Sequence, residues 1–276
     1  MLTRRTGFFV FLLLAAGGLL AWAALRPAGK RPGGTAQQGS EAMTASNRPE
    51  ICEETVFEGA RTILCVVDPA AHEARLVYRD GKGQPYGSVP RAVAALAAAG
   101  RTPVLAMNAG MYHADMTPVG LYVEDGAVVS PLNPGDGFGN FFLKPNGVFF
   151  IRADGSAGVM ESGVYAEAEI DPLFATQSGP MLVIDGAIHP RFLPDGTTRY
   201  IRNGVGVRGD GKIVLAITRD EVSLGLFGRL FRDLARCPNA LFFDGAVSSL
   251  AWGSEMEIDS GEPAGPVVAV FAKTAE

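Results

Sequence analysis

The stretch "LFFDGAVSSL", residues 241–250, decides how the chain is interpreted, because it ends an apolar run in an Asp-Gly pair. An Asp-Gly pair between apolar runs usually predicts a hairpin, since both residues tolerate the positive φ of tight turns. Here, however, the segment 223–238, "SLGLFGRLFRDLARCP", has apolar residues three and four positions apart and predicts an amphipathic helix beginning at Ser223. Asp244 therefore lies at the carboxyl end of a predicted strand that directly follows a predicted helix. Sheets connected by helices often bind ligands at this end of their strands. The residues after it still allow a return strand.

Four other Asp-Gly pairs lie between two apolar runs each, and they predict ordinary hairpins. These pairs are Asp125-Gly126, Asp154-Gly155, Asp185-Gly186 and Asp210-Gly211. A second helix is predicted over residues 88–100, with Pro90 in its first turn and Gly100 at its end. The predicted fold class is α+β: a single domain of antiparallel hairpins around a mixed β-sheet, with two or three packed helices.

The first 50 residues have the composition of a leader and a linker. Arginines at positions 4 and 5 precede an uncharged apolar run, which predicts a signal peptide or an N-terminal membrane anchor over residues 1–28. Residues 29–50 are polar and rich in Gly and Ser, as is typical of a flexible linker. Residues 51–276 then form the domain. We expect a periplasmic or otherwise extracytoplasmic protein, either secreted or associated with the membrane through its N-terminus.

The charge balance and the cysteines limit which binding partners and which cellular compartment are plausible for the protein. Five of the 24 basic residues precede Pro32, so 19 basic residues stand against 29 acidic ones in the rest of the chain. An acidic exported domain is a poor binder of nucleic acid, so we do not expect a nucleic-acid partner. Cys52 and Cys65 lie 13 positions apart, and outside the cytoplasm they predict a local disulfide, with two buried thiols as the alternative. Cys237 is expected to be a buried residue rather than a nucleophile.

The sequence contains no motif that supports a bound cofactor or metal. The segment "GVGVRG", residues 204–209, matches a dinucleotide fingerprint, but a turn and a strand follow it where that motif needs a helix. The sequence has neither a phosphate-binding P-loop nor a serine nucleophile elbow, and no His or Cys pair stands at zinc-ligand spacing. Carboxylate oxygens near Asp244 would suit a divalent cation, but no ligand pattern supports one. No cofactor and no metal is therefore assigned.

Polar residues stand at the ends of several apolar strands, each beside glycine or other small residues. They are Asn108, the set Thr176, Gln177 and Ser178, the pair Arg202 and Asn203, and Asp244. Each alone is explained by a turn, which Asn and Asp often cap. Four such groups in one domain predict a shared pocket, because neighbouring glycines let the backbone approach a ligand.

The motifs "NAGMY", "SGPMLVIDG", "RNGVGV" and "FFDGAVSS", in this order, resemble the phosphodiester glycosidase family from about Val104 to the C-terminus. The resemblance implies an exported hydrolase that cleaves the glycosidic bond of sugar-1-phosphodiesters in envelope glycans or glycolipids. Enzyme-like members carry D-G-G-x-S, whereas this chain has Ala246 and Val247 after Gly245, and Asn203 stands where Thr is common. These departures leave a second hypothesis open, a non-catalytic glycan-binding or exopolysaccharide biosynthesis accessory protein with the same fold.

Cleavage of such a bond builds positive charge at the anomeric carbon and negative charge on phosphate, so it needs a carboxylate and a cation. Asp244 is the predicted carboxylate, with Asn108 as a further catalytic residue. Arg202 is the predicted phosphate partner, because its planar fork can pair with two oxygens; Lys144 and Arg199 are second choices.

The remaining predicted contacts would hold a carbohydrate phosphodiester or an anionic glycan. His113 is either an acid-base group or a simple hydrogen-bonding residue. The predicted binding residues are Gly110, His113, Lys144, Gln177, Ser178, Gly179, Asn203, Gly245, Ser248 and Ser249.

Overall fold

The computed structural model of the protein describes residues 47–273. The predicted leader and nearly all of the predicted linker lie outside the described residues. These described residues form one compact unit. In the described part of the chain, no helix is both long enough and apolar enough to cross a bilayer.

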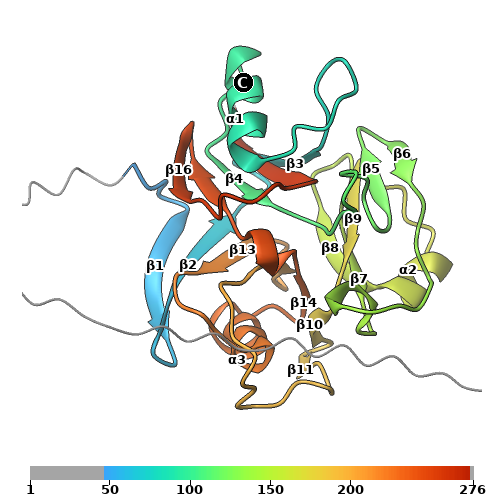
Figure 1. The fold of residues 1–276 in the computed structure, drawn as a ribbon, viewed down its shortest axis with the longest axis vertical. Coiled ribbons are helices and arrows are strands. Elements are labelled where there is room, and N and C mark those ends of the chain that lie inside the picture. Colours follow the sequence, from blue (N-terminus) through green and yellow to red (C-terminus); the bar gives the residue numbers. More distant parts are fainter. Residues whose placement is uncertain (1–46, 274–276) are drawn as a thin grey trace, which may run out of the picture. The chain divides into compact units, whose positions relative to one another are not determined.

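Three antiparallel sheets build the domain (Figure 1). The seven-stranded sheet has, in spatial order, β1 (Cys52–Phe57), β2 (Ala60–Val67), β13 (Ile213–Thr218), β12 (Asn203–Val207), β14 (Asn239–Phe242), β10 (Met181–Ile184) and β11 (Ala187–Ile188). The second sheet has β16 (Glu255–Ile258), β15 (Leu250–Trp252), β4 (Leu105–Asn108), β17 (Val267–Ala272) and β3 (His72–Val77). The third sheet has β6 (Ala127–Ser130), β5 (Tyr122–Glu124), β9 (Phe174–Ser178), β7 (Gly147–Ile151) and β8 (Ala157–Glu161).

Three α-helices cover the sheets: α1 (Val89–Ala98), α2 (Ser162–Glu167) and α3 (Leu224–Arg229), which continues as a π-helix over Leu230–Leu234. The predicted α+β class is confirmed. Every strand pairing among residues 47–273 is antiparallel, so three antiparallel sheets stand where one mixed sheet was expected. Even β14, which follows the π-helix, runs antiparallel to both of its neighbours.

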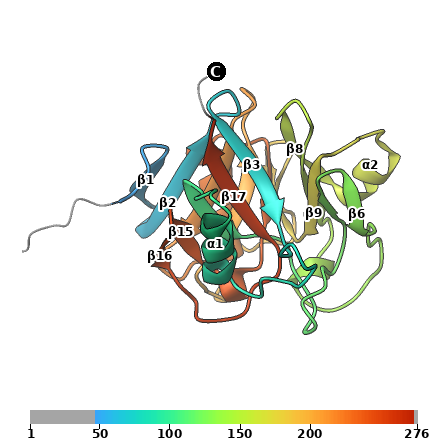
Figure 2. The same cartoon turned by 90° about the horizontal axis from the view of Figure 1, so that it is seen from above.

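The seven-stranded and second sheets pack face to face, with one helix on each outer face. Alternation along β13 shows how: Ile213, Leu215 and Ile217 point into the core between the sheets, while Val214 and Ala216 join the cluster under α3. Helix α1 packs on the outer face of the second sheet, where it can be seen from above in Figure 2. The central strands of both sheets are therefore buried on two faces, whereas the edge strands β1 and β16 are partly exposed.

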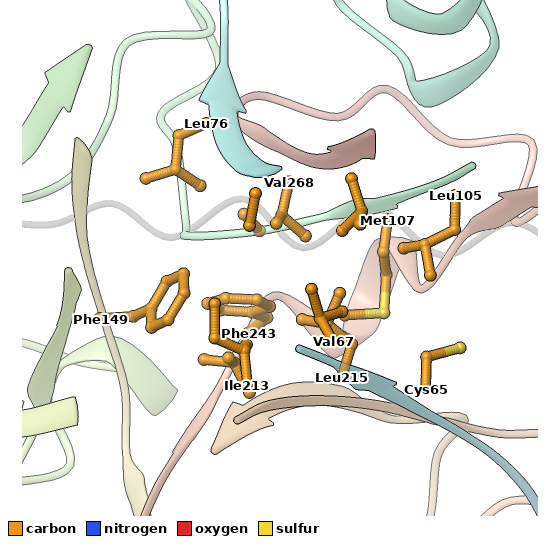
Figure 3. Close-up of a cluster of buried hydrophobic side chains, with 14 of the residues drawn as sticks. Cys65, Val67, Leu76, Leu105, Met107, Phe149, Ile213, Leu215, Phe243 and Val268 are labelled. Atoms are coloured by element: carbon orange, nitrogen blue, oxygen red, sulfur yellow. The ribbon is translucent and has the colours of Figure 1, made fainter. Parts of the chain in front are cut away.

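The third sheet closes one side of this sandwich. Phe149 of β7 reaches the central core and lies edge-on to Phe243, with 6.4 Å between the ring centroids. Figure 3 shows Phe149 and Phe243 facing Leu76 and Val268 of the second sheet across the core. The core thus fixes Phe243, which is the residue directly before Asp244.

The local predictions for the four hairpins and two helices are confirmed. Asp125 and Gly126 both have positive φ, 49° and 77°, as a primed two-residue turn requires. The other three predicted pairs also lie in turns between paired strands. Ser223 caps α3 by accepting the Leu226 N–H at 3.1 Å.

The predicted disulfide is present. Cys52 and Cys65 stand directly opposite each other on β1 and β2 and are joined through their sulfurs. Cys237 is a buried free thiol, and burial raises its pKa to about 12. A thiol that holds its proton so firmly is a packing residue, as expected.

Candidate functional site

The Asp244-Gly245 pair is not a hairpin turn. Asp244 has an ordinary φ of −75° and begins a short 3₁₀ helix, Gly245–Val247, in which its carboxylate accepts the Ala246 N–H at 3.2 Å. A side chain at Gly245 would lie 2.6 Å from the Phe242 ring. Glycine is needed here for close packing of the backbone, and not for a positive φ.

Arg202 lies beside this segment because β12 and β14 are paired, with Gly204 opposite Phe242. Its side chain is buried, and its Nε and Nη2 donate to the carbonyl oxygens of Val222 at 2.7 Å and Thr198 at 3.2 Å. Its guanidinium also lies over the Phe242 ring. Burial lowers its pKa to about 10, so it stays charged at neutral pH. No carboxylate of residues 47–273 forms an ion pair with it.

Asp244 and Arg202 line the same cavity, of about 290 Å³. The other lining residues are Asn140, Tyr200, Phe242, Gly245 and Ala246, so Asp244 is the one acidic group of its wall. Burial raises the pKa of Asp244, and the Ala246 N–H offsets part of that rise. The cavity therefore holds a carboxylate and an uncompensated cation that do not neutralise each other, which suits a ligand with one anionic and one electron-poor centre.

Asn108 lies behind Asp244 rather than in the cavity wall. Its Nδ2 donates to the Asp244 carbonyl oxygen at 2.8 Å, and its Oδ1 accepts from Asn203 Nδ2 at 3.0 Å and from Ser249 N at 2.9 Å. A buried amide with these partners positions the Asp244 peptide. Direct contact of Asn108 with the reacting sugar stays a prediction.

The other polar residues near Asn108 belong to the same network. Asn203 donates to the Asn108 carbonyl oxygen at 2.8 Å and accepts from Ser248 Oγ at 3.1 Å. Ser249 Oγ donates to the Val247 carbonyl oxygen and lies 3.0 Å from Ser260 Oγ. This network ties β4, β12 and the 3₁₀ helix together under Asp244, so the predicted group of polar residues is largely a scaffold.

The "ATQSG" residues lie away from this cavity. Gln177 is buried; its Oε1 accepts the backbone N–H groups of Leu121 and Asn133, and its Nε2 donates to the Asn133 carbonyl oxygen. Ser178 is buried, and its Oγ makes no hydrogen bond within the described residues. A side chain at Gly179 would meet the Phe141 carbonyl oxygen at 2.7 Å. These residues fix the loop that presents Asn140.

The remaining predicted contacts are also outside the cavity wall. Gly110 packs so closely on Thr176 that a side chain would collide with it. His113 is exposed. Lys144 is paired with Asp136 at 2.9 Å, and Arg199 donates to the Glu221 carbonyl oxygen at 3.3 Å. Of the predicted binding residues, Gly245 lines the cavity and Ser248 lines an adjoining one.

Four residues of the wall were not among the predicted site residues: Asn140, Tyr200, Phe242 and Ala246, the last noted only as a departure from the family motif. Tyr200 precedes Arg202 by two positions. The Arg202 guanidinium lies over the Tyr200 ring, 5.6 Å from its centroid. Asn140 stands in an apolar stretch of sequence, "GNFF", although the residue itself is exposed, and Phe242 has the pattern of an ordinary strand residue. Only Tyr200 had a local signal, because alternate residues of an extended segment share a face.

The described residues contain no group of three or more His, Cys, Asp or Glu side chains that could hold a metal ion. The cavity wall itself carries one carboxylate, Asp244, and one arginine, Arg202. The arginine can bind an anionic group, and the carboxylate can stabilise a developing positive charge.

Comparison with known proteins identifies the family of the chain. The model of the phosphodiester glycosidase family matches residues 101–271. The uncharacterized protein YigE of Escherichia coli (strain K12) is 32% identical over 184 residues, which cover 67% of this chain and 71% of YigE. The protein belongs to the phosphodiester glycosidase family, which is a family of hydrolases.

Solved structures share the fold. The catalytic domain of zebrafish N-acetylglucosamine-1-phosphodiester alpha-N-acetylglucosaminidase, auto-inhibited by its pro-peptide, has a TM-score of 0.58 at 14% identity, over 80% of this chain and 82% of that one. A hypothetical protein from Synechocystis has a TM-score of 0.54 at 14% identity, over 80% and 61%. A Burkholderia pseudomallei K96243 protein whose name describes it as exported has a TM-score of 0.51 at 12% identity, over 77% and 74%.

Proposed function

We propose that this protein is an exported hydrolase that cleaves the glycosidic bond of sugar-1-phosphodiesters in envelope glycans or glycolipids. The observation that carries the proposal is the cavity shared by Asp244 and Arg202, one ionisable carboxylate beside one buried arginine without an acidic partner. Membership of the phosphodiester glycosidase family supports the reaction type.

The reaction breaks the bond between the anomeric carbon and the phosphate oxygen and bonds that carbon to the oxygen of a water molecule, which releases one proton to the phosphate or the solvent. The electron pair leaves with the phosphate oxygen, and Arg202 stabilises the growing negative charge, since its Nη1 has no hydrogen-bond partner in the described residues. Asp244 stabilises the electron-poor anomeric carbon as nucleophile, general base or counter-charge. A phosphate leaving group needs little protonation, which agrees with a wall that holds a single carboxylate.

An extracytoplasmic location is part of the proposal. The disulfide between Cys52 and Cys65 supports an oxidising compartment, and the exported Burkholderia pseudomallei protein has the same fold. The predicted leader over residues 1–28 supplies the route of export.

The test is sugar release by the purified protein from a panel of hexose and N-acetylhexosamine 1-(methyl phosphate) diesters. Asp244→Asn is expected to lower kcat by about 10³ and Arg202→Lys to lower kcat/KM by about 10². Asp210→Asn is the matched control: Asp210 also precedes a glycine and accepts the N–H two residues on, at 3.2 Å, but in an exposed hairpin. Its activity is expected to equal that of the native protein.

A second function is tested by the same panel. Ala246 lines the cavity where enzyme-like members have glycine, and this supports a binding module that keeps the fold without turnover. Saturable binding of an anionic glycan without cleavage, equally strong in Asp244→Asn, would favour that function. Turnover above the blank, abolished by Asp244→Asn, would exclude it.

A further inference from the structure

The cavity that holds Asp244 and Arg202 is the middle of a longer groove. A second cavity of about 280 Å³ shares Asn140, Tyr200 and Arg202 with it. A third cavity of about 370 Å³ shares Tyr200, Gly245 and Ala246 with it. Tyr200 lines all three, so a ligand bound at Asp244 has one arm of the groove on each side.

The second cavity, here the leucine arm, has four large apolar side chains among its polar residues and contains no carboxylate. Its apolar walls come from Leu143, Phe192, Leu193 and Leu224, and Arg191 stands with Arg202 as its only charged residues. Leu193 is 71% exposed and Tyr200 is 56% exposed. Large apolar side chains gathered at the mouth of a polar site are typical of a surface that covers an apolar ligand.

The leucine arm is held in shape by contacts outside it. Phe192 stacks on the ring of His189, with 4.6 Å between centroids. Arg229 donates to the Pro194 carbonyl oxygen at 3.1 Å and is itself paired with Glu58 at 2.6 Å. Because these contacts lie within the protein itself, binding in this arm needs little ordering of the loop.

The third cavity, here the acidic arm, has the opposite charge. Glu221 and Asp259 are its charged residues, and Ser248 and Ser260 add hydroxyl groups. Two carboxylates repel a phosphate, whereas carboxylates and hydroxyls accept hydrogen bonds from sugar hydroxyls. The phosphate therefore belongs on the Arg202 side of the groove, and the sugar belongs on the side of Asp244 and the acidic arm.

We propose that the groove selects phosphodiesters whose phosphate carries an apolar alcohol, such as an alkyl or lipid chain, and that this chain occupies the leucine arm. The inference rests on the proposed cleavage of sugar-1-phosphodiesters and deepens it. With the sugar in the acidic arm and the phosphate at Arg202, the second phosphate ester points into the leucine arm. Each methylene group buried there contributes about fourfold in affinity.

The test compares two substrates of equal charge and equal sugar, N-acetylglucosamine 1-(octyl phosphate) and N-acetylglucosamine 1-(glyceryl phosphate). The native protein is expected to show a kcat/KM at least about tenfold higher for the octyl compound, since two or more methylenes are buried. Leu193→Ser is expected to bring this ratio close to one. Val128→Ser is the matched control, because Val128 is 67% exposed on β6 and outside the groove, and it should keep the native ratio.

Binding of both compounds to Asp244→Asn, measured by calorimetry, separates this inference from the proposed function. Tighter binding of the octyl compound that Leu193→Ser removes supports the leucine arm even if the native protein cleaves neither. Equal affinities for the two compounds, or a preference that Leu193→Ser leaves unchanged, would overturn the inference. Equal cleavage of both would do the same while leaving the proposed hydrolysis intact.

Discussion

At the scale of single residues, burial sets the chemistry of the site. Arg202 keeps its charge although burial lowers its pKa to about 10, and Asp244 is held in an environment that raises its pKa. Both groups are less stable in this setting than in water, which is a usual cost of an active site. The pKa of Tyr112 is raised to about 12, first by the burial of its own hydroxyl and then by the negative charge of Asp244.

Asp244→Asn is therefore expected to stabilise the protein at neutral pH. The folded-state pKa of Asp244 is raised above its unfolded value, so the ionised carboxylate costs stability once the pH has risen through the folded pKa. Below the unfolded value of about 3.9 the carboxyl is protonated in both states and the cost is absent. Urea unfolding at pH 7 and at about pH 3 should show a gain for the variant at pH 7 that shrinks at pH 3. An equal gain at both values would contradict the cause given.

At the scale of elements, the Asp-Gly dipeptide has two different structural roles in this protein. In the hairpin between β12 and β13, Gly211 has φ +82° and open space around it. At the end of β14, Gly245 has no positive φ but touches the Phe242 ring. One glycine is required by its backbone conformation and the other by packing, and only the second supports the cavity wall.

The two substitutions Gly245→Ala and Gly211→Ala separate these purposes. Gly211→Ala is expected to cost about 1 kcal/mol in the free energy of unfolding, from the left-handed backbone, with no change in activity. Gly245→Ala is expected to cost about 1–3 kcal/mol, because the new methyl displaces the Phe242 ring, and to lower kcat by moving Asp244. Denaturation curves and sugar release check both. Full activity in a folded Gly245→Ala variant would show that the wall tolerates the shift.

At the scale of the whole molecule, the site depends on neighbours far apart in the chain. Asn108 from β4 anchors the Asp244 peptide, while Phe149 of the third sheet packs on Phe243. The seven-stranded sheet itself ends in β1, an edge strand that pairs with β2 and is fastened to it by the disulfide. That edge lies four strands away from β14, so its stability and the activity are separable.

Replacing both Cys52 and Cys65 by alanine is expected to lower the free energy of unfolding by about 3 kcal/mol. The disulfide closes a short loop, with a sequence separation of 13, and its loss frees the unfolded chain. Sugar release at 25 °C should be unchanged, since the bridge is remote from the cavity. Reductant should destabilise the native protein and leave the double variant unaffected. If the folded double variant lost activity at 25 °C, the structure of β1 would be coupled to the site.

Local structure and the two central residues were predictable from the sequence. The four hairpins and the two predicted helices follow from backbone preferences and apolar periodicity, which act over a few residues. Asp244 and Arg202 were predictable because each ends an apolar strand next to small residues, in motifs that occur in a fixed order. These signals are contained in short segments and survive without knowledge of the fold.

The tertiary structure alone decided which polar residues line the cavity. A buried amide that anchors a peptide and an amide that binds a sugar have the same sequence signature, so Asn108 and Asn203 were indistinguishable from residues of the wall. Conversely, Asn140 and Leu193 had no signal, because their place in the groove arises from strand pairings and loop contacts between distant segments. The sequence determined the elements and pointed to Asp244 and Arg202, whereas the pairing of strands and sheets determined the shape and charge of the groove around them.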